Sequence, residues 1–293
     1  MRILHLDAGR EMRGGQWQVL RLIEGLAGAG VESTLLARAG SPLEGAARDG
    51  GWRVEPLGFV RAALLGRRHD LIHAHDARSH TLGAIAGGAP LVVARRVAFP
   101  VGSRWKYGRA RHYLAVSEFV KQVLMAGGVP AEKISVVYDG VPVLEPSAGR
   151  RVLVLANFSD RQKGAPLTME AARLAGIELL LTGNLERDLP QAAAFVYITH
   201  AEGLGSAALL AMSAGVPVIA SRVGGLPEVV RDRETGLLVE NSPAAVAGAI
   251  IQLDRDPEFA RRLGQGARRA VVENFTVDHM VRRTMEVYQK ALS

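Results

Sequence analysis

Residues 200–240 read HAEGLGSAALLAMSAGVPVIASRVGGLPEVVRDRETGLLVE, and this stretch decides the fold of the chain. It begins with an acidic residue, Glu202, in a glycine-rich turn, and a run of small residues at 206–214 that is typical of a helix follows the turn. An apolar strand at 216–220 and a Gly-Gly-Leu-Pro helix start at 224–227 come next. This order predicts half of a βαβ unit. Because a helix start presents unpaired N–H groups, a helix start beside a carboxylate suits a ligand with both phosphate and hydroxyl groups.

The composition predicts a globular protein with an anionic partner. The 293 residues are 48% hydrophobic, which is enough for two domains with cores of ordinary size. Lys and Arg number 36 and Asp and Glu number 29, and the net charge of +7 favours a sugar nucleotide, an acidic lipid surface or nucleic acid. Since the chain has no cysteine, disulfides, cysteine-zinc sites and thiol catalysis are excluded.

The sequence shows no targeting segment. It begins directly with a strand pattern, and no apolar run approaches the roughly 18 residues that a membrane-spanning helix needs. We therefore expect a cytoplasmic protein, with the inner face of the plasma membrane as a second location.

The first half alternates short apolar runs with helical segments, and the predicted strands lie at 2–6, 32–37, 53–57, 71–74, 91–94 and 113–116. Such alternation predicts an α/β fold with a doubly wound parallel sheet, which binds ligands at the carboxyl ends of its strands. His75 and Asp76 fall at such an end. Gly14 and Gly15 precede a helical pattern at 16–29, where they would let a ligand approach the backbone. A plain turn remains an alternative because a full G-x-G-x-x-G is absent.

His73 and His75 share one face of a predicted strand because they are two residues apart. A metal pair is one interpretation, but Asp76 would then point elsewhere, so we favour ordinary hydrogen-bonding histidines. We expect no metal and no cofactor.

The stretch from Arg95 to Arg111 is basic and contains no acid; its cations are Arg95, Arg96, Arg104, Lys106, Arg109 and Arg111. Phe99, Trp105 and Tyr107 lie among them, and Tyr113 follows. Cations interleaved with aromatic residues bind nucleic acid or anionic lipid headgroups, and the alternative is a solvated basic face with aromatic residues in the core. Because no nucleic-acid-binding signature accompanies the stretch, we expect no nucleic acid partner.

A breaker-rich connection at 144–149 predicts a domain boundary. We expect an N-terminal Rossmann-like domain at 1–146, a C-terminal Rossmann-like domain at 147–275, and a closing helix at 276–293 that packs back toward the first domain. Arg161 and Lys163 precede a helix predicted at 165–175. Fixed positive charge at a helix start favours binding of a diphosphate.

Together these patterns resemble the family 4 retaining glycosyltransferases of GT-B fold. The matching phrases are Gly14-Gly15, DLIHAHD at 70–76, AVSE at 115–118, the strand and turn at 134–141, and R-x-K-G at 161–164. The most specific matches are EGLG at 202–205, AMSAGVPVIA at 211–220, GGLPE at 224–228 and GLLV at 236–239. The resemblance covers nearly the whole chain and implies two Rossmann-like domains that face each other across a cleft.

The resemblance implies a nucleotide-sugar donor bound by the second domain and a lipid-linked or saccharide acceptor held by the first, with retention of configuration. Arg161 and Lys163 would bind the donor diphosphate and stabilise the leaving group, and Glu202 would contact the transferred sugar. The backbone around Gly203, Leu204, Gly205 and Ser206 would assist the phosphate. Gly14, Gly15, His75 and Arg95 complete the expected binding residues.

The chain departs from the family pattern at four places, and two of them, Leu210 and the short stretch at 179–199, motivate a second hypothesis beside the enzyme. Leu210 stands where the family has the second glutamate of a pair, which usually bonds the ribose. Arg95 and Arg96 stand near a usual histidine, Tyr138-Asp139-Gly140 replaces a common Asn-Gly, and the stretch at 179–199 is short. The second hypothesis is a catalytically silent protein that binds a saccharide or a partner protein. A nicotinamide oxidoreductase would need the dinucleotide fingerprint that is missing.

Overall fold

The computed structural model describes residues 1–155 and 164–293, and the chain divides into two compact units. The first unit combines Met1–Gly140 with Val277–Ser293, and the second comprises Val141–Thr276. The boundary between the units thus lies at 140/141, six residues before the position expected from the breaker-rich connection. Each unit contains one parallel sheet with helices around it, so the predicted α/β fold class is confirmed.

The first unit is built on a seven-stranded parallel sheet in the order β3-β2-β1-β4-β5-β6-β7. The strands are β1 (Arg2–Asp7), β2 (Glu32–Ala37), β3 (Arg53–Pro56), β4 (Leu71–Ala74), β5 (Leu91–Arg95), β6 (His112–Ala115) and β7 (Ile134–Val136). The strand order reverses between β1 and β4. The connections after these two strands therefore leave toward opposite faces of the sheet, and α/β sheets bind ligands at the carboxyl ends of the strands at such a point. We call this edge the crevice of the first unit.

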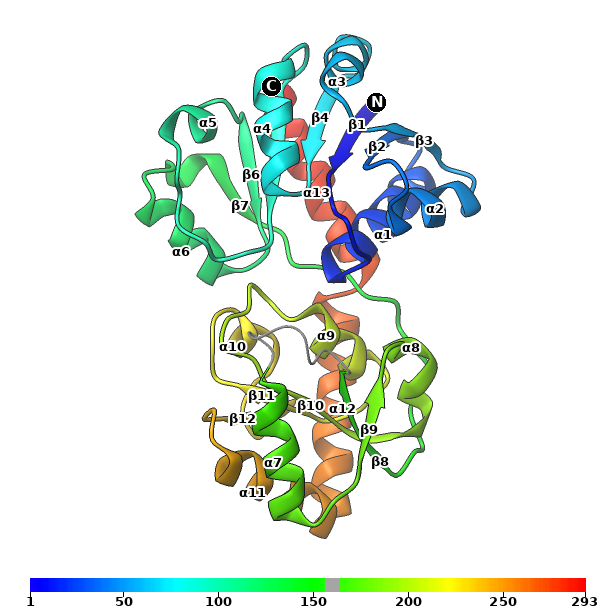
Figure 1. The fold of residues 1–293 in the computed structure, drawn as a ribbon, viewed down its shortest axis with the longest axis vertical. Helices are drawn as coiled ribbons and strands as arrows, with labels where there is room; N and C mark the ends of the chain where they lie inside the picture. Colours follow the sequence, from blue (N-terminus) through cyan, green and yellow to red (C-terminus); the bar gives the residue numbers. More distant parts are fainter. Residues whose placement is uncertain (156–163) are drawn as a thin grey trace. The chain divides into compact units, whose positions relative to one another are not determined.

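The helices of the first unit are α1 (Gly14–Gly28), α2 (Pro42–Asp49), α3 (Phe59–Gly66), α4 (Ala77–Ala86), α5 (Arg104–Gly108), α6 (Glu118–Ala126), the 3₁₀ turn η1 (Ala131–Lys133) and α13 (Val277–Leu292). Helix α13, drawn red in Figure 1, joins this unit from the far end of the chain. Its buried residues, among them Val281 and Tyr288, share one apolar cluster with Leu22 of α1 and Ile3 of β1. The closing helix is therefore part of the first core.

The second unit has a five-stranded parallel sheet in the order β12-β11-β10-β8-β9. Its strands are β8 (Arg151–Leu155), β9 (Leu179–Thr182), β10 (Ala192–Tyr197), β11 (Val218–Ser221) and β12 (Gly236–Val239). Its helices are α7 (Ala165–Ala175), α8 (Leu185–Asp188), the 3₁₀ turn η2 (Leu189–Gln191), α9 (Ser206–Ser213), α10 (Leu226–Val229), α11 (Pro243–Arg255) and α12 (Pro257–Asn274). Here the strand order reverses between β8 and β10.

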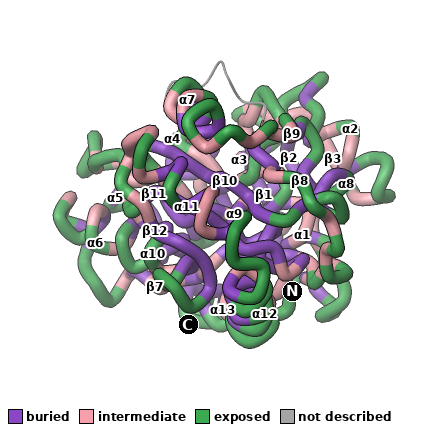
Figure 2. The backbone as a smooth tube through the Cα atoms, turned by 90° about the horizontal axis from the view of Figure 1, so that it is seen from below, coloured by how far each residue is buried: buried purple, intermediate pink, exposed green. Residues whose placement is uncertain are grey.

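Burial follows this layered plan in both units. Figure 2 shows buried backbone mainly along the strands and exposed backbone mainly in loops and on outer helix faces. The short stretch at 179–199 holds only β9, the single turn α8, η2 and β10. Among the described residues, none of the helices combines the length and the apolar character that a bilayer crossing needs.

One close approach between α1 and α13 depends on a glycine. A Cβ atom added to Gly25 would lie 2.5 Å from Cγ2 of Val281, whereas one added to Gly28 would meet nothing within 4 Å. Alanine at either position gains helix propensity, but only at position 25 must it push α13 away. We expect Gly25→Ala to lower the free energy of unfolding of the first unit by about 1–3 kcal/mol relative to Gly28→Ala.

Tryptophan fluorescence during urea unfolding measures this difference. All three tryptophans, Trp17, Trp52 and Trp105, belong to the first unit, so the signal reports on that unit alone. Equal stabilities of the two variants would show that α13 does not depend on this contact.

Candidate functional site

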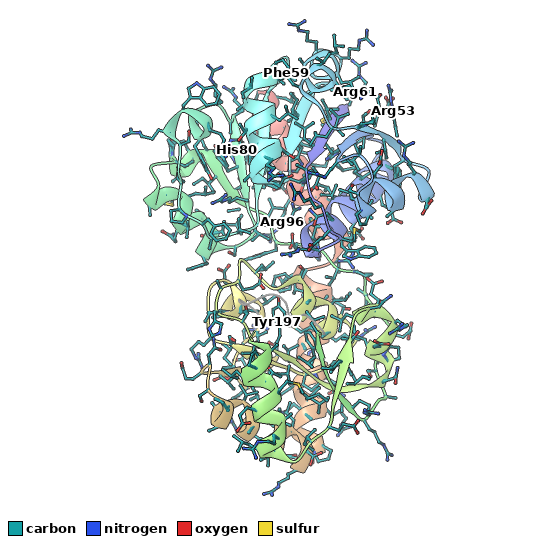
Figure 3. All side chains as sticks on the ribbon, viewed as in Figure 1. Arg53, Phe59, Arg61, His80, Arg96 and Tyr197 are labelled. Carbon is teal, nitrogen blue, oxygen red and sulfur yellow. The ribbon has the colours of Figure 1, made fainter. Side chains whose placement is uncertain are left out.

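In the second unit, Glu202 is oriented by two hydrogen bonds at the carboxyl end of β10. The hydroxyl of Tyr197 donates to Oε2 at 2.5 Å, and the backbone N–H of Gly203 donates to Oε1 at 3.1 Å. The side chain is half-buried, and Figure 3 shows Tyr197 at the end of the strand that leads into this turn. The sequence predicts Glu202 but not Tyr197, which looks like an ordinary core residue at the end of an apolar run.

Two glycines hold the loop before α10 directly against the turn that carries Glu202. A Cβ atom on Gly224 would lie 2.0 Å from the carbonyl oxygen of Glu202, and one on Gly225 would lie 2.1 Å from that of Gly203. Gly224 also has a φ of +57°, and the N–H of Gly225 donates to the carbonyl of Glu202 at 3.2 Å. Only glycine allows this approach, which fixes the backbone of the turn.

Helix α9 begins directly after the same turn. Gly205 precedes it with a φ of +106°, Gly203, Leu204 and Gly205 are buried, and Ser206 is half-buried. The first N–H groups of α9 thus lie within a few residues of the Glu202 carboxylate. Leu210 is only 7% exposed and is a packing residue of α9, so the position of the family's second glutamate carries no polar group.

A buried hydrogen-bond network that the sequence does not reveal supports the end of β10. The N–H of Thr199 donates to Oγ of Ser221 at 2.9 Å, and this hydroxyl donates to Oδ1 of Asn241 at 2.6 Å. Asn241 returns a bond to the carbonyl of Thr199 at 2.9 Å. Thr199, Ser221 and Asn241 come from separate segments of the chain, so no local sequence motif predicts this network.

Arg161 and Lys163 lie outside the described residues, so their roles stay predictions. The residue that follows them, Gly164, is described, and its N–H donates to the carbonyl of Ile198 at 3.0 Å. A Cβ atom on Gly164 would lie 2.7 Å from Cγ2 of Ile198. The R-x-K-G phrase therefore ends next to the chain that leaves β10, at the point where the strand order reverses.

In the first unit, carboxylates organise the two loops that leave β1 and β4. Asp7 is buried and accepts from the N–H of Gly9 at 2.8 Å and from the side-chain amide of Gln16 at 3.2 Å. Burial raises the pKa of Asp7 above its usual value. Asp76 accepts from the N–H of Ala8 at 2.6 Å and caps α4. The predicted position of Asp76 at the carboxyl edge is thus occupied by a structural carboxylate.

Arg96, and not Arg95, turns into this crevice. Its Nε donates to Oδ1 of Asp139 at 3.2 Å, and its Nη1 lies 3.4 Å from Nδ1 of His75 (Figure 3). Helix α1 begins at Gly14, and a Cβ atom on Gly15 would lie 3.8 Å from Cδ of Arg96. Gly14, Gly15, His75 and Arg96 therefore come together at one edge of the sheet.

The structure places Arg95 away from the expected site. Its side chain is buried, donates to the carbonyl of Phe99 and lies 5.8 Å from the ring of Tyr107. The physical reason is the alternation of a strand, because consecutive residues point to opposite faces and only one of two adjacent arginines can face the crevice. Arg96 is thus a candidate site residue. The sequence alone indicates only that it lies near the position of the family's usual histidine.

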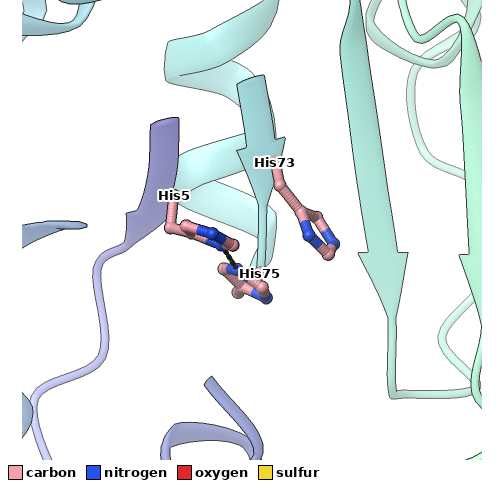
Figure 4. A group of neighbouring side chains, drawn as sticks. All are labelled: His5, His73 and His75. Atoms are coloured by element: carbon pink, nitrogen blue, oxygen red, sulfur yellow. Dashed lines mark hydrogen bonds between the residues drawn. The ribbon is translucent and has the colours of Figure 1, made fainter. Parts of the chain in front are cut away.

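Three histidines lie close together where β1 and β4 pair, as Figure 4 shows. Nδ1 of His5 lies 3.0 Å from Nε2 of His75, and Nδ1 of His73 lies 2.7 Å from the hydroxyl of Tyr288. Burial lowers the pKa of His5 to about 3. Burial and the neighbouring charged groups also hold the pKa of His73 and that of His75 well below the usual value. All three rings are therefore neutral near pH 7.

One ring nitrogen from each of the three histidines lies within 4.8 Å of the others, which is a spacing that a metal ion could use. The guanidinium of Arg96 at 3.4 Å from His75 opposes a second cation there, and a ligand carboxylate is absent from this group of described residues. His73 and His75 each make a side-chain hydrogen bond, and the expectation of no metal stays a prediction. His5 is the member of the group that the sequence does not reveal.

The basic stretch from Arg95 to Arg111 divides into a buried and an exposed part. Tyr107 and Tyr113 are core residues, whereas Phe99 is 58% and Trp105 is 51% exposed. The guanidinium of Arg109 lies 5.1 Å from the ring centre of Trp105. The two tyrosines fit the interpretation of a basic face with aromatic residues in the core, and contact with anionic lipid stays a prediction.

Comparison with known proteins assigns the chain to a family. Residues 12–143 match the family described as Glycosyltransferase Family 4, and residues 154–270 match the one described as Glycosyl transferases group 1. A D-inositol 3-phosphate glycosyltransferase of Corynebacterium efficiens is 30% identical over 214 residues, which are 68% of this chain and 48% of that protein. The chain belongs to the family 4 glycosyltransferases.

Other relatives of this family 4 glycosyltransferase match a shorter part. The alpha-maltose-1-phosphate synthase of Mycolicibacterium smegmatis is 39% identical over 120 residues, which are 39% of this chain and 31% of that protein. The chain thus spans less than half of the length of these curated relatives.

Solved structures agree with the fold of this family 4 glycosyltransferase. Anabaena HepE in complex with UDP-glucose has a TM-score of 0.87 at 17% identity and covers 99% of both chains. Sucrose-phosphate synthase from Thermosynechococcus elongatus has a TM-score of 0.80 at 19% identity, over 99% of this chain and 98% of that one. At such identities the likeness shows the fold, which is GT-B.

The neutral histidines predict how the stability of this glycosyltransferase responds to pH. Below pH 6.5 the unfolded chain binds protons at histidines that the folded protein leaves neutral, so acid favours unfolding. For His5 this window extends from about 6.5 down to about 3. We expect the His5→Asn variant to lose about 1 kcal/mol less stability per pH unit than the wild type between pH 6.5 and 5.

Urea unfolding followed by tryptophan fluorescence at pH 7, 6 and 5 measures these slopes. The exposed His200 provides the control, because His200→Asn lies in the other unit and should leave the slope unchanged. Equal slopes for wild type and His5→Asn would contradict the assignment of a neutral His5.

Proposed function

We propose that the chain transfers a sugar from a nucleotide-sugar donor to a lipid-linked or saccharide acceptor, with retention at the anomeric carbon. The observation that carries this proposal is the position of Glu202. Its carboxylate is held by Tyr197 and Gly203 beside the start of α9, where the strand order of the second sheet reverses. A parallel α/β sheet binds its ligand at this place.

In the proposed reaction, Glu202 accepts hydrogen bonds from hydroxyl groups of the transferred sugar. The carboxylate orients the sugar and favours the positive charge that develops at the anomeric carbon. Tyr197 donates to one oxygen of Glu202, which fixes the orientation of the carboxylate in the turn. The two-glycine contact at 224–225 keeps the turn rigid, which such orientation requires.

The donor diphosphate is assigned to Arg161, Lys163 and the amides between Gly203 and Ser206. Two cations and several N–H groups stabilise the negative charge of the departing nucleoside diphosphate, which is the main demand of this chemistry. We propose that these groups replace a divalent cation, so transfer needs no metal and no other cofactor. HepE, the structural neighbour named above, has been solved with UDP-glucose, which supports a nucleotide-sugar donor for this fold.

The acceptor is assigned to the crevice of the first unit. Arg96 offers guanidinium donors there, and the backbone at the start of α1, at Gly14 and Gly15, is uncrowded. Asp7 is buried and orders the loop that leaves β1 beside them. A saccharide or a lipid-linked phosphate suits this combination of groups.

Activity tests this proposal with Glu202→Gln as the first variant. We expect this change to lower kcat about 100-fold, because the amide keeps the shape but loses the negative charge. The assay measures nucleotide release from a set of sugar nucleotides with lipid and glycan acceptors in the presence of EDTA. Glu178→Gln is the control, because Glu178 is 87% exposed and is expected to retain full activity. Inactivity of the wild type toward every donor would instead support a silent saccharide-binding protein.

Calorimetry separates donor binding from catalysis. Arg161→Ala and Lys163→Ala should each weaken nucleotide-sugar binding about 10- to 100-fold, since each removes a charge-assisted contact to the diphosphate. Undiminished affinity in both variants would remove these residues from the proposed site.

We further propose that the stretch from Arg95 to Arg111 contacts an anionic membrane. The exposed Phe99 and Trp105 next to arginines provide an apolar and basic surface of the kind that settles at lipid headgroups. The double variant Phe99→Ser and Trp105→Ser should bind vesicles of phosphatidylglycerol and phosphatidylcholine at least about tenfold more weakly. Co-sedimentation measures this binding, with pure phosphatidylcholine vesicles as the uncharged reference.

A matched control comes from α3 of the same unit. Phe59 and Leu64 are 51% and 53% exposed, and Figure 3 shows Phe59 and Arg61 on this helix. Phe59→Ser with Leu64→Ser should leave vesicle binding unchanged. A loss in this variant alone would assign the membrane contact to α3.

A further inference from the structure

Behind the crevice of the first unit, polar side chains form a continuous chain that runs from Arg96 into the sheet. Nη1 of Arg96 lies 3.4 Å from Nδ1 of His75, and Nε2 of His75 lies 3.0 Å from Nδ1 of His5. Nε2 of His5 lies 3.3 Å from Oγ of Ser33 on β2. Each imidazole thus uses both of its nitrogens, one toward the crevice and one toward the interior of the sheet.

The arginine sets the direction of every bond in this chain. A guanidinium only donates, so Nδ1 of His75 must accept. Because His75 is neutral, its proton lies on Nε2 and is donated to Nδ1 of His5. By the same argument His5 carries its proton on Nε2 and donates it to Ser33. Arg96 therefore fixes the tautomer of two buried histidines, and these histidines in turn present a lone pair to Arg96.

Arg96 is held from two sides by this arrangement. Asp139 binds its Nε at 3.2 Å, His75 binds its Nη1, and the side chain is 16% exposed. These contacts use two of the five N–H groups of a guanidinium, so the others can face a ligand in the crevice. A fixed guanidinium is suited to a phosphate group, which it binds through two parallel hydrogen bonds.

We propose that His5 and Ser33 are positioning residues that aim Arg96, through His75, at a phosphate group bound in the crevice of the first unit. The inference rests on the proposed function and deepens it, because that function places a saccharide or a lipid-linked phosphate at this edge and the inference chooses the phosphate-bearing acceptor. Neither residue reaches the ligand. His5 supplies the acceptor that keeps the proton of His75 on Nε2, and Ser33 supplies the acceptor that keeps the proton of His5 on Nε2.

Nitrogen-15 NMR of labelled histidine tests the tautomers without any reaction. We expect His5 and His75 both to carry the proton on Nε2 and to remain neutral between pH 5.5 and 8. The titratable and charged groups next to these two rings are His69, His73 and Arg96. Asp139 pairs with Arg96, and Tyr288 bonds His73. A proton on Nδ1 of His75 overturns the chain. Zinc provides a second test, because a zinc ion between His75 and His5 needs a lone pair on the facing nitrogen of each ring. Loss of the proton between these two nitrogens on titration with zinc also overturns the chain.

Phosphate binding tests the effect on Arg96. With inorganic phosphate as the probe, His5→Leu should weaken binding about tenfold, because it leaves Nε2 of His75 without an acceptor, a loss of about 1.4 kcal/mol. His5→Asn keeps a polar atom at the position of Nδ1 and should stay within about twofold of wild type. Ser33→Ala should fall between the two. Equal affinity of His5→Leu and wild type, or no phosphate binding by the wild type, overturns the proposal.

His112 provides a matched control in the same sheet. It is also buried and also bonds a serine of the adjacent strand, with Nε2 at 3.0 Å from Oγ of Ser135, but its bonds do not lead to Arg96. His112→Leu should therefore lose stability and keep its phosphate affinity. If no nucleotide sugar is turned over but the tautomers and the phosphate pattern hold, the proposed function fails and this inference stands. The reverse pattern refutes this inference alone.

Discussion

Parallel strand pairing is the constraint on which the rest of this structure depends. Every strand pair in both sheets is parallel, so all carboxyl ends of a sheet lie along one edge. Each parallel strand is also followed by a crossover connection to the next strand. Only where the strand order reverses do the connections of two neighbouring strands run to opposite faces of the sheet. In the first sheet this occurs between β1 and β4, where Asp7, His75 and Asp76 lie. In the second it occurs between β8 and β10, where Glu202 lies.

The sequence predicts the parts of this plan that are local. Strand runs, the helix at 165–175, the closing helix and Glu202 follow from periodicity and glycine spacing within a few residues, and the structure bears out the α/β fold built on them. Contacts between distant segments leave no such trace. His5 and His75 are separated by 70 positions, and Tyr288 reaches His73 across 215. Whether Arg95 or Arg96 faces the crevice depends on where β5 ends and on which face each residue then lies. An error of one residue in the predicted end of this strand exchanges the two faces.

The two candidate sites use burial in different ways. In the first unit, burial removes charge from three imidazoles, and the fixed charge of Arg96 is compensated by Asp139. In the second unit, Glu202 remains half-buried, and its contacts include the phenol of Tyr197 and the backbone N–H of Gly203. The first arrangement fixes positions and tautomers, whereas the second orients a carboxylate that keeps part of its surface exposed.

Leu210 stands where the family has a glutamate, and this difference affects both the stability of the protein and the contacts open to a donor. A carboxylate at a position that is 7% exposed is costly unless a bound ligand pairs it, so a glutamate there would lower the stability of the free protein. Leucine gains apolar burial in α9 instead, which raises stability and removes one polar contact to a ribose. If the chain binds a nucleotide sugar as proposed, donor affinity then comes from the diphosphate and the sugar. The proposal therefore gives Arg161, Lys163 and Glu202 a larger share of binding than the full family motif would require.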